Sequence, residues 1–118
     1  MKIRSKVITI DTTDPLKSKI EVISAYFNVT SDSESNTLYL LYKAHQNAPF
    51  YLSKANRELI CSSVISISAF NQSISRLIKK DLIRKIDGKN YCLNPVFADI
   101  DTVEQISFRF NITQKNPA

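Results

Sequence analysis

The chain has one glycine among its 118 residues, and this residue limits both what the chain can fold into and what it can bind. Gly88 lies in the polar segment 87–90, between two β-prone runs at residues 82–86 and 91–93. Glycine adopts a positive φ without steric cost, and tight hairpin turns require such a residue. We therefore predict a two-stranded β-hairpin that ends before Pro95.

The composition also argues against catalysis. Nucleotide-binding loops need several glycines for close backbone approach, and this chain has one. His45 is the only histidine, and Cys61 and Cys92 are far apart in the sequence, so soft donors for a four-ligand zinc site are too few. We expect a packing histidine and two buried thiols, with a disulfide as the alternative. The prediction is no enzyme, no cofactor and no metal.

Length and hydropathy predict a single domain over residues 1–118. A chain of 118 residues with 43% hydrophobic residues is large enough for one core. We divide it into an N-terminal part (1–35), a core (36–95) and a C-terminal part (96–118). No apolar run approaches the roughly 18 residues of a membrane span, and the first residues lack the apolar stretch of a secretory signal. We expect a cytoplasmic protein with no membrane partner.

The first predicted helix starts at Pro15, a favoured first helical position. Its apolar residues recur at helical spacing, at Leu16, Ile20, Ile23 and Phe27. A strand with alternating Ile20, Val22 and Tyr26 is the alternative. Residues 30–36 are all polar, which predicts a linker because none of them favours burial.

Three further helices are predicted in the core. The first covers residues 37–46, with Leu38, Leu41, Tyr42 and His45 on one face. A short strand at 50–52 precedes a helix that is capped by Ser53 and directs Ala55, Leu59 and Ile60 inward. The third begins at the capping residue Ser66 and repeats Phe70, Ile74, Leu77 and Ile78 at helical spacing up to residue 81.

This order of elements predicts an α+β fold, a winged helix-turn-helix with extra N- and C-terminal strands. In that fold the third helix enters the major groove of DNA and the hairpin rests on the neighbouring backbone. The extra strands are expected at residues 3–10 and 104–113. The second has one strongly apolar face, so it must pair with residues 3–10 or with the same strand of a second chain. A homodimer would suit recognition of two DNA half-sites.

The excess positive charge lies in the middle of the chain. Residues 36–95 carry nine Lys and Arg against three Asp and Glu, a net of +6, whereas the charges of residues 1–35 cancel. Such a segment favours contact with a polyanion, where cations bind phosphates and Asn or Gln can contact adenine. The predicted DNA-binding residues are Ser66, Ser68, Asn71, Gln72, Ser75, Arg76, Lys79, Lys80, Arg84, Lys85 and Lys89.

Part of the core also resembles a known family. The segment 65–77, the run 80–85 and the ending Tyr-x-Leu-Asn-Pro-x-Phe at 91–97 are similar to the winged-helix core of RepL-type plasmid replication proteins and of small winged-helix proteins of bacterial mobile elements and phages. The resemblance covers residues 36–97. It implies double-stranded DNA binding in replication initiation or transcription regulation, inside a bacterial host cell. Two departures are Ser62-Ser63-Val64 in place of the usual glycine turn, and Ala69 in place of a common threonine.

A second hypothesis assigns the same fold to a different class of function. Winged helices also serve as protein–protein modules, here as an accessory or virion component of a phage with a phage or host protein as partner. The serine-rich face of the third helix, which carries no arginine before Arg76, favours this alternative.

Overall fold

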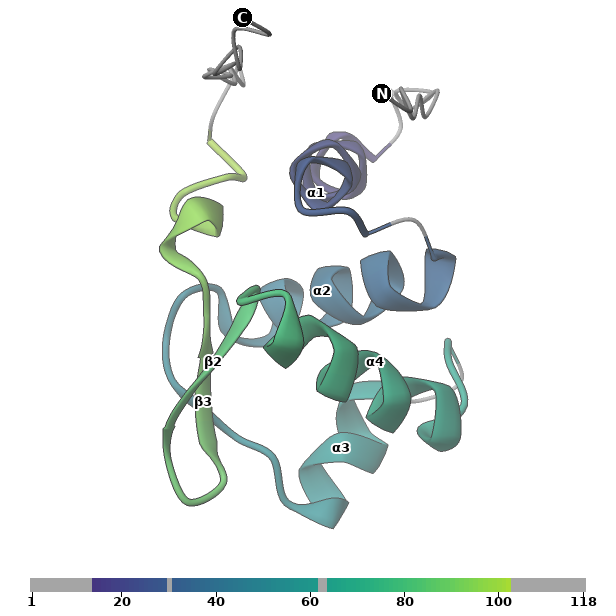
Figure 1. Ribbon diagram of the computed structural model, residues 1–118, viewed down its shortest axis with the longest axis vertical. Coiled ribbons are helices and arrows are strands. Elements are labelled where there is room, and N and C mark those ends of the chain that lie inside the picture. The colour runs from purple at the N-terminus through teal and green to yellow at the C-terminus, as the bar shows by residue number, and fades with distance from the viewer. Residues whose placement is uncertain (1–13, 30, 62–63, 103–118) are drawn as a thin grey trace, which may run out of the picture.

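Four helices and a three-stranded antiparallel sheet make up the described part of the chain, which is residues 14–29, 31–61 and 64–102 of a computed structural model (Figure 1). The elements are α1 (Pro15–Tyr26), α2 (Asp32–His45), β1 (Phe50–Tyr51), α3 (Lys54–Cys61), α4 (Ile67–Lys79), β2 (Ile83–Asp87), β3 (Asn90–Leu93) and the 3-10 helix η1 (Pro95–Phe97). The predicted α+β class is confirmed at this level. The strands predicted at 3–10 and 104–113 lie outside the described residues.

Helix α1 forms where the apolar spacing predicts it. The Asp14 side chain accepts a hydrogen bond from the Lys17 amide at 3.2 Å, which caps the first turn. Ile20 and Ile23 are buried against the core. The alternative of a strand in this segment was wrong, because a spacing of three and four residues places these side chains on one helical face.

The predicted linker at residues 30–36 was wrong from residue 31 onward. Helix α2 begins at Asp32, and the Ser31 hydroxyl caps it by accepting a hydrogen bond from the Glu34 amide at 3.2 Å. Glu34 and Ser35 are buried although both are polar. A serine followed by a glutamate three residues later is a helix-start signal, and it outweighs the polar composition of the segment.

Helix α3 begins as predicted, with the Ser53 hydroxyl accepting a hydrogen bond from the Asn56 amide at 3.2 Å. The predicted inner face was wrong for Ala55 and Leu59. Both are exposed, and 78% of Leu59 is accessible to solvent. Cys61 is buried instead, and Arg57, one helical turn before it, turns inward to bind the carbonyl of Leu52. Ile60, as predicted, is partly buried against the core, so Ile60 and Cys61 form the inner side of this helix.

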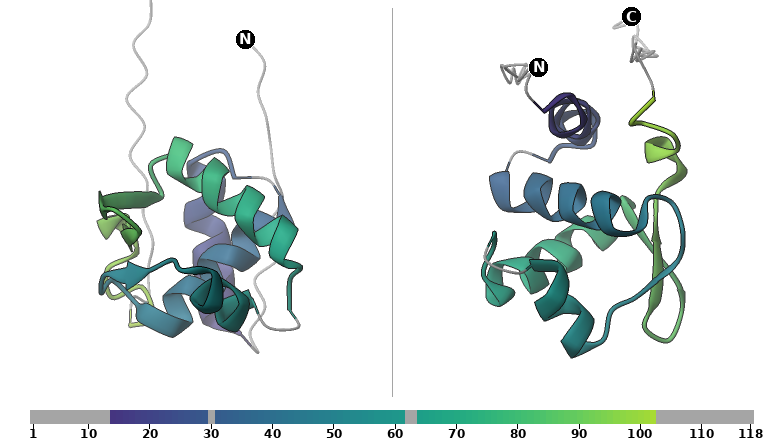
Figure 2. Two further views of the ribbon diagram at one scale, coloured as in Figure 1. Left: turned by 90° about the horizontal axis from the view of Figure 1, so that it is seen from below. Right: turned by 180° about the vertical axis from the view of Figure 1, so that it is seen from behind.

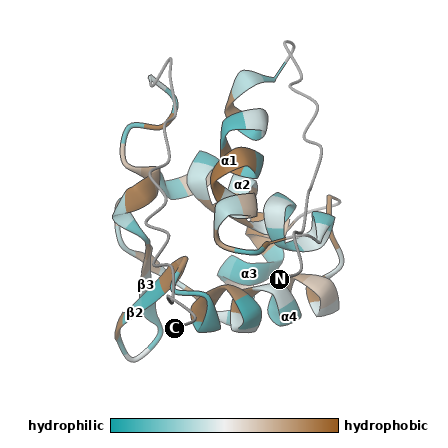
Figure 3. Cartoon of the chain, turned by 45° about the horizontal axis from the view of Figure 1, so that its top comes forward, coloured by the Kyte–Doolittle hydropathy of each residue, from teal (hydrophilic) through white to brown (hydrophobic). Residues whose placement is uncertain are grey.

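Helix α4 follows its predicted pattern closely. The Ser66 hydroxyl accepts a hydrogen bond from the Ala69 amide at 3.2 Å and caps the helix. Phe70, Ile74 and Leu77 are buried, whereas Ile78, predicted to face inward, is 37% exposed. Hydrophobic and hydrophilic residues alternate along the helix in Figure 3. One face of α4 is therefore fixed in the core and the other is left for solvent.

The hairpin also forms as predicted. Strand β3 lies between β1 and β2, with Phe50 opposite Tyr91 and Ile83 opposite Leu93. Gly88 has a φ of +47°, the conformation that the turn requires. The pairing is irregular between Lys85 and Asp87, next to the turn.

Helix α2 occupies the middle of the molecule. Helix α1 packs on one side of it, and α3 and α4 lie on the other (Figure 2). The His45 ring stacks on Phe50 with 5.3 Å between centroids, which confirms its packing role. Cys61 is a buried free thiol and Cys92 a partly buried one, so the two cysteines form no disulfide. None of the helices among the described residues is long and apolar enough to cross a membrane.

Candidate nucleic-acid interface

The outer face of α4 carries the polar residues predicted to contact DNA. Its buried residues hold this face outward, and all seven predicted residues from the helix and its cap are exposed: Ser66, Ser68, Asn71, Gln72, Ser75, Arg76 and Lys79. The hydroxyl of Ser66 already accepts the capping hydrogen bond. Helix α4 contains no acidic residue, so nothing on it repels a phosphate.

Four of the predicted cations are exposed and unpaired. Arg76 and Lys79 lie in the last turn of α4, and Lys85 and Lys89 lie on the hairpin. Among the residues that the structure describes, none of the four forms an ion pair. Their charges are therefore available to an anionic partner.

The other two predicted cations are already paired. The Lys80 ammonium lies 3.1 Å from Oε1 of the buried Glu34 and also donates to the backbone carbonyl of Asn28. Arg84 donates two hydrogen bonds to the Asp81 carboxylate, at 3.1 and 3.0 Å. These bonds lower the pKa of Asp81 and raise the pKa of Arg84. Both cations are thus partly neutralised within the protein.

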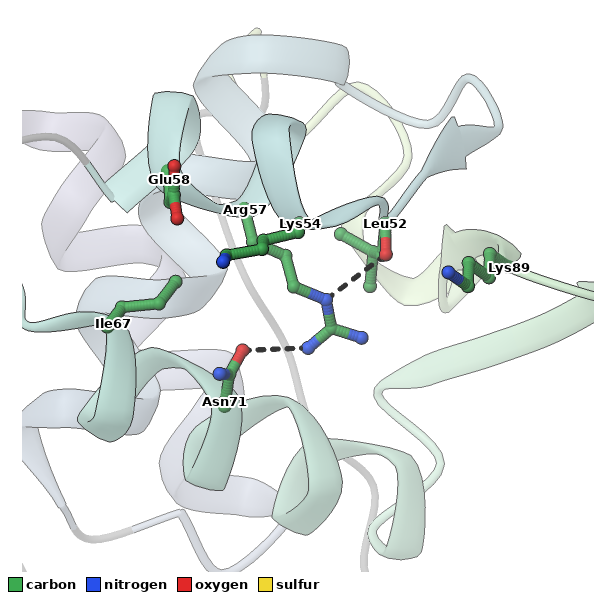
Figure 4. Close-up of a pocket in the computed structure, with 7 residues that line it drawn as sticks. All are labelled: Leu52, Lys54, Arg57, Glu58, Ile67, Asn71 and Lys89. Carbon is green, nitrogen blue, oxygen red and sulfur yellow. Dashed lines mark hydrogen bonds between the residues drawn. The ribbon is translucent and has the colours of Figure 1, made fainter.

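A pocket of about 500 Å³ opens between α3, α4 and the hairpin turn (Figure 4). Its lining residues are Leu52, Lys54, Arg57, Glu58, Ile67, Asn71 and Lys89. Nη1 of Arg57 donates to Oδ1 of Asn71 at 2.9 Å, and its Nε donates to the carbonyl of Leu52 at 3.1 Å. Of the predicted DNA-binding residues, Asn71 and Lys89 therefore line the same pocket.

Lys54 and Arg57 belong to this pocket but were not among the predicted site residues. Their charges contributed to the positive middle segment, and that was the only signal in the sequence. Their position beside Asn71 depends on how α3 packs against α4, which local spacing does not specify.

A second hollow, of about 480 Å³, lies between α2 and α3. Its lining residues are Leu40, Lys43, Ala44, His45, Asn56, Leu59 and Ile60. Leu59 at its edge is the most exposed of the large apolar side chains in the described ranges. This surface is mixed in character and separate from the polar face of α4.

No family model, no curated protein and no solved structure matches the chain. The similarity to plasmid replication proteins stays a prediction.

Proposed function

We propose that the chain is a winged-helix protein that binds double-stranded DNA, with α4 in the major groove and the β2–β3 hairpin against the adjacent backbone. The observation that carries this proposal is the outer face of α4, which is polar, free of acidic residues and flanked by the four unpaired cations. A helix fits the major groove, which is about 12 Å wide.

The exposed side chains of α4 and the hairpin fall into two groups, those that suit phosphate contacts and those that can contact bases. Arg76, Lys79, Lys85 and Lys89 suit phosphate contacts, which set affinity and orientation but carry little sequence information. Gln72 is exposed at the middle of α4 and can form two hydrogen bonds with adenine. The exposed hydroxyls of Ser68 and Ser75 flank it and suit either bases or phosphates.

The proposed biological role is replication initiation or transcription regulation in a bacterial mobile element or phage. Its support is the resemblance of residues 36–97 to replication proteins of the RepL type.

Titration of a random-sequence duplex at several salt concentrations tests this function. Four phosphate contacts, one for each unpaired cation, predict that log affinity falls with log salt at a slope of about −3.6. Lys85→Ala should weaken binding and flatten this slope by about one unit. Lys17→Ala provides the matched control, because it removes the same charge from α1, on the far side of α2 from α4 (Figure 2). Absence of duplex binding at low salt would rule out the proposal.

The alternative function is a protein–protein module. The observation that favours it is Leu59, which is 78% exposed beside the hollow between α2 and α3. If the unmodified protein is folded but binds no duplex, the protein–protein module becomes the favoured function.

A further inference from the structure

We propose that the pocket between α3, α4 and the hairpin turn holds one backbone phosphate of the bound DNA together with its sugar, and that Asn71 positions Arg57 there instead of contacting a base. This inference rests on the proposed function. It goes further by assigning a DNA group to one pocket and by giving Asn71 a different role from its neighbour Gln72.

The guanidinium of Arg57 is held in place and still has free donors. It has five N–H groups, of which one from Nε binds the carbonyl of Leu52 and one from Nη1 binds Asn71. The remaining three N–H groups have no partner among the described residues. A guanidinium fork with neighbouring free donors matches two phosphate oxygens, and its fixed orientation reduces the entropy lost on binding.

The rest of the pocket matches a sugar-phosphate unit. Lys54, Arg57 and Lys89 bring three positive charges against the one negative charge of Glu58, a net of +2. Ile67, which is 39% exposed, adds an apolar wall that suits the carbons of a sugar. The volume of about 500 Å³ lies within the roughly 300 to 1,000 Å³ that is usual for small-ligand sites.

The orientation of the Asn71 amide follows from Arg57. A guanidinium only donates hydrogen bonds, so the amide oxygen must face it and the amide nitrogen must point away. An asparagine that contacts adenine with two hydrogen bonds needs both atoms at the base edge. Gln72, by contrast, has no such bond to a described residue, so its amide remains free to contact a base.

Binding of a random-sequence duplex by four single variants separates these roles. We expect Arg57→Met to weaken binding about five- to tenfold and Asn71→Ala to weaken it about threefold. Both variants disturb a phosphate contact that every DNA sequence offers. Gln72→Ala should leave random-sequence affinity unchanged. Arg84→Met is the matched charge control, since Arg84 is also an arginine but is already bound to Asp81, and it should weaken binding less than Arg57→Met does.

Two further variants test the electrostatics of the pocket. Glu58→Gln should strengthen duplex binding about twofold, because it removes the one negative charge of the lining. Arg57→Lys keeps the charge and should retain most of the salt slope while losing part of the affinity, since an ammonium lacks the planar fork. Thermal unfolding of each variant verifies the fold, and the Glu58 side chain forms no hydrogen bond to any residue that the structure describes.

The results of these experiments separate failure of the pocket assignment from failure of the proposed DNA binding. If the parent binds no random duplex, the proposed function fails and the pocket assignment fails with it. If the parent binds but Asn71→Ala keeps the parent's affinity for random duplex, DNA binding stands and the positioning role of Asn71 is wrong. Equal losses in Arg57→Met and Arg84→Met would likewise overturn the phosphate pocket while leaving DNA binding intact.

Discussion

Lys79 and Lys80 are adjacent in the sequence, yet the structure gives them different surroundings. Lys79 is exposed on the outer face of α4, whereas Lys80 reaches the start of α2 and pairs with the buried Glu34 at 3.1 Å. Neighbouring positions on a helix point about 100° apart, so one lysine faces solvent while the next faces a packed helix. Lys80 therefore joins α2 to the end of α4, and Lys79 is the better phosphate contact.

Replacing Lys80 tests this assignment. Lys80→Ala leaves the Glu34 carboxylate buried without its cation, and we expect a loss of roughly 1 to 2 kcal/mol in the free energy of unfolding. This figure is below that of a fully buried pair because Lys80 is 31% exposed. Urea denaturation gives the value, and Lys79→Ala is the control that should unfold like the parent. Equal stabilities of the two variants would contradict the structural role of Lys80.

At the scale of elements, apolar spacing and helix-start residues predicted α1 and α4, and Gly88 between two β-prone runs predicted the hairpin, because each signal lies within a few residues. The sequence did not predict the burial of Glu34, since this burial depends on Lys80, which is distant in the sequence. The inner face of α3 was also missed. Its eight residues span about two turns, so its apolar spacing is too short to define one face, and Cys61 rather than Leu59 is buried.

The candidate site was predictable to a similar degree. The exposed residues of α4 follow from its helical period, so the amino-acid pattern is enough to identify that face. The pocket combines Leu52, Asn71 and Lys89, which come from three separate segments. Only the packing of α3, α4 and the hairpin brings these segments together, and a single sequence contains no direct signal for that packing.

Helix α1 is attached to α2 by a hydrogen bond whose strength depends on pH. The Tyr39 hydroxyl donates to Oδ2 of Asp14 at 2.6 Å. This bond, with burial and the negative charge of Asp14, raises the pKa of Tyr39 from 10.0 to about 12. Because the folded state favours the protonated phenol, the stabilisation is complete below pH 10 and is lost as the pH rises through 12.

Tyr39→Phe removes this bond and its pH dependence. We expect the variant to be about 1 kcal/mol less stable than the parent near pH 8, a modest value because Tyr39 is partly exposed. The difference should shrink as the pH rises from 10 to 12, and chemical denaturation of both proteins at each pH measures it. A stability difference that stays constant over this range would contradict the assigned pKa.

At the scale of the whole molecule, the fold separates an anchored side from a free side. On the side of α1, the Tyr42 hydroxyl donates to Asp101 at 3.0 Å and the Lys19 ammonium donates to the Asp101 carbonyl at 3.4 Å. These bonds tie α1 and the turn after η1 to α2. The unpaired cations of α4 and the hairpin lie elsewhere, on elements that contact α2 from the other side or extend away from it (Figures 1 and 2).

The most direct test of the central claim, that α4 and the hairpin contact DNA, is the change in backbone amide chemical shifts when duplex is added to the isotope-labelled protein. We predict the largest changes at Ser68, Gln72 and Ser75 on α4 and at Lys89 in the hairpin turn, with the amides of α1 unchanged. A short duplex at low salt suffices, because phosphate contacts form with any sequence. Changes confined to α1 or to the surface around Leu59, with α4 unaffected, would contradict the account.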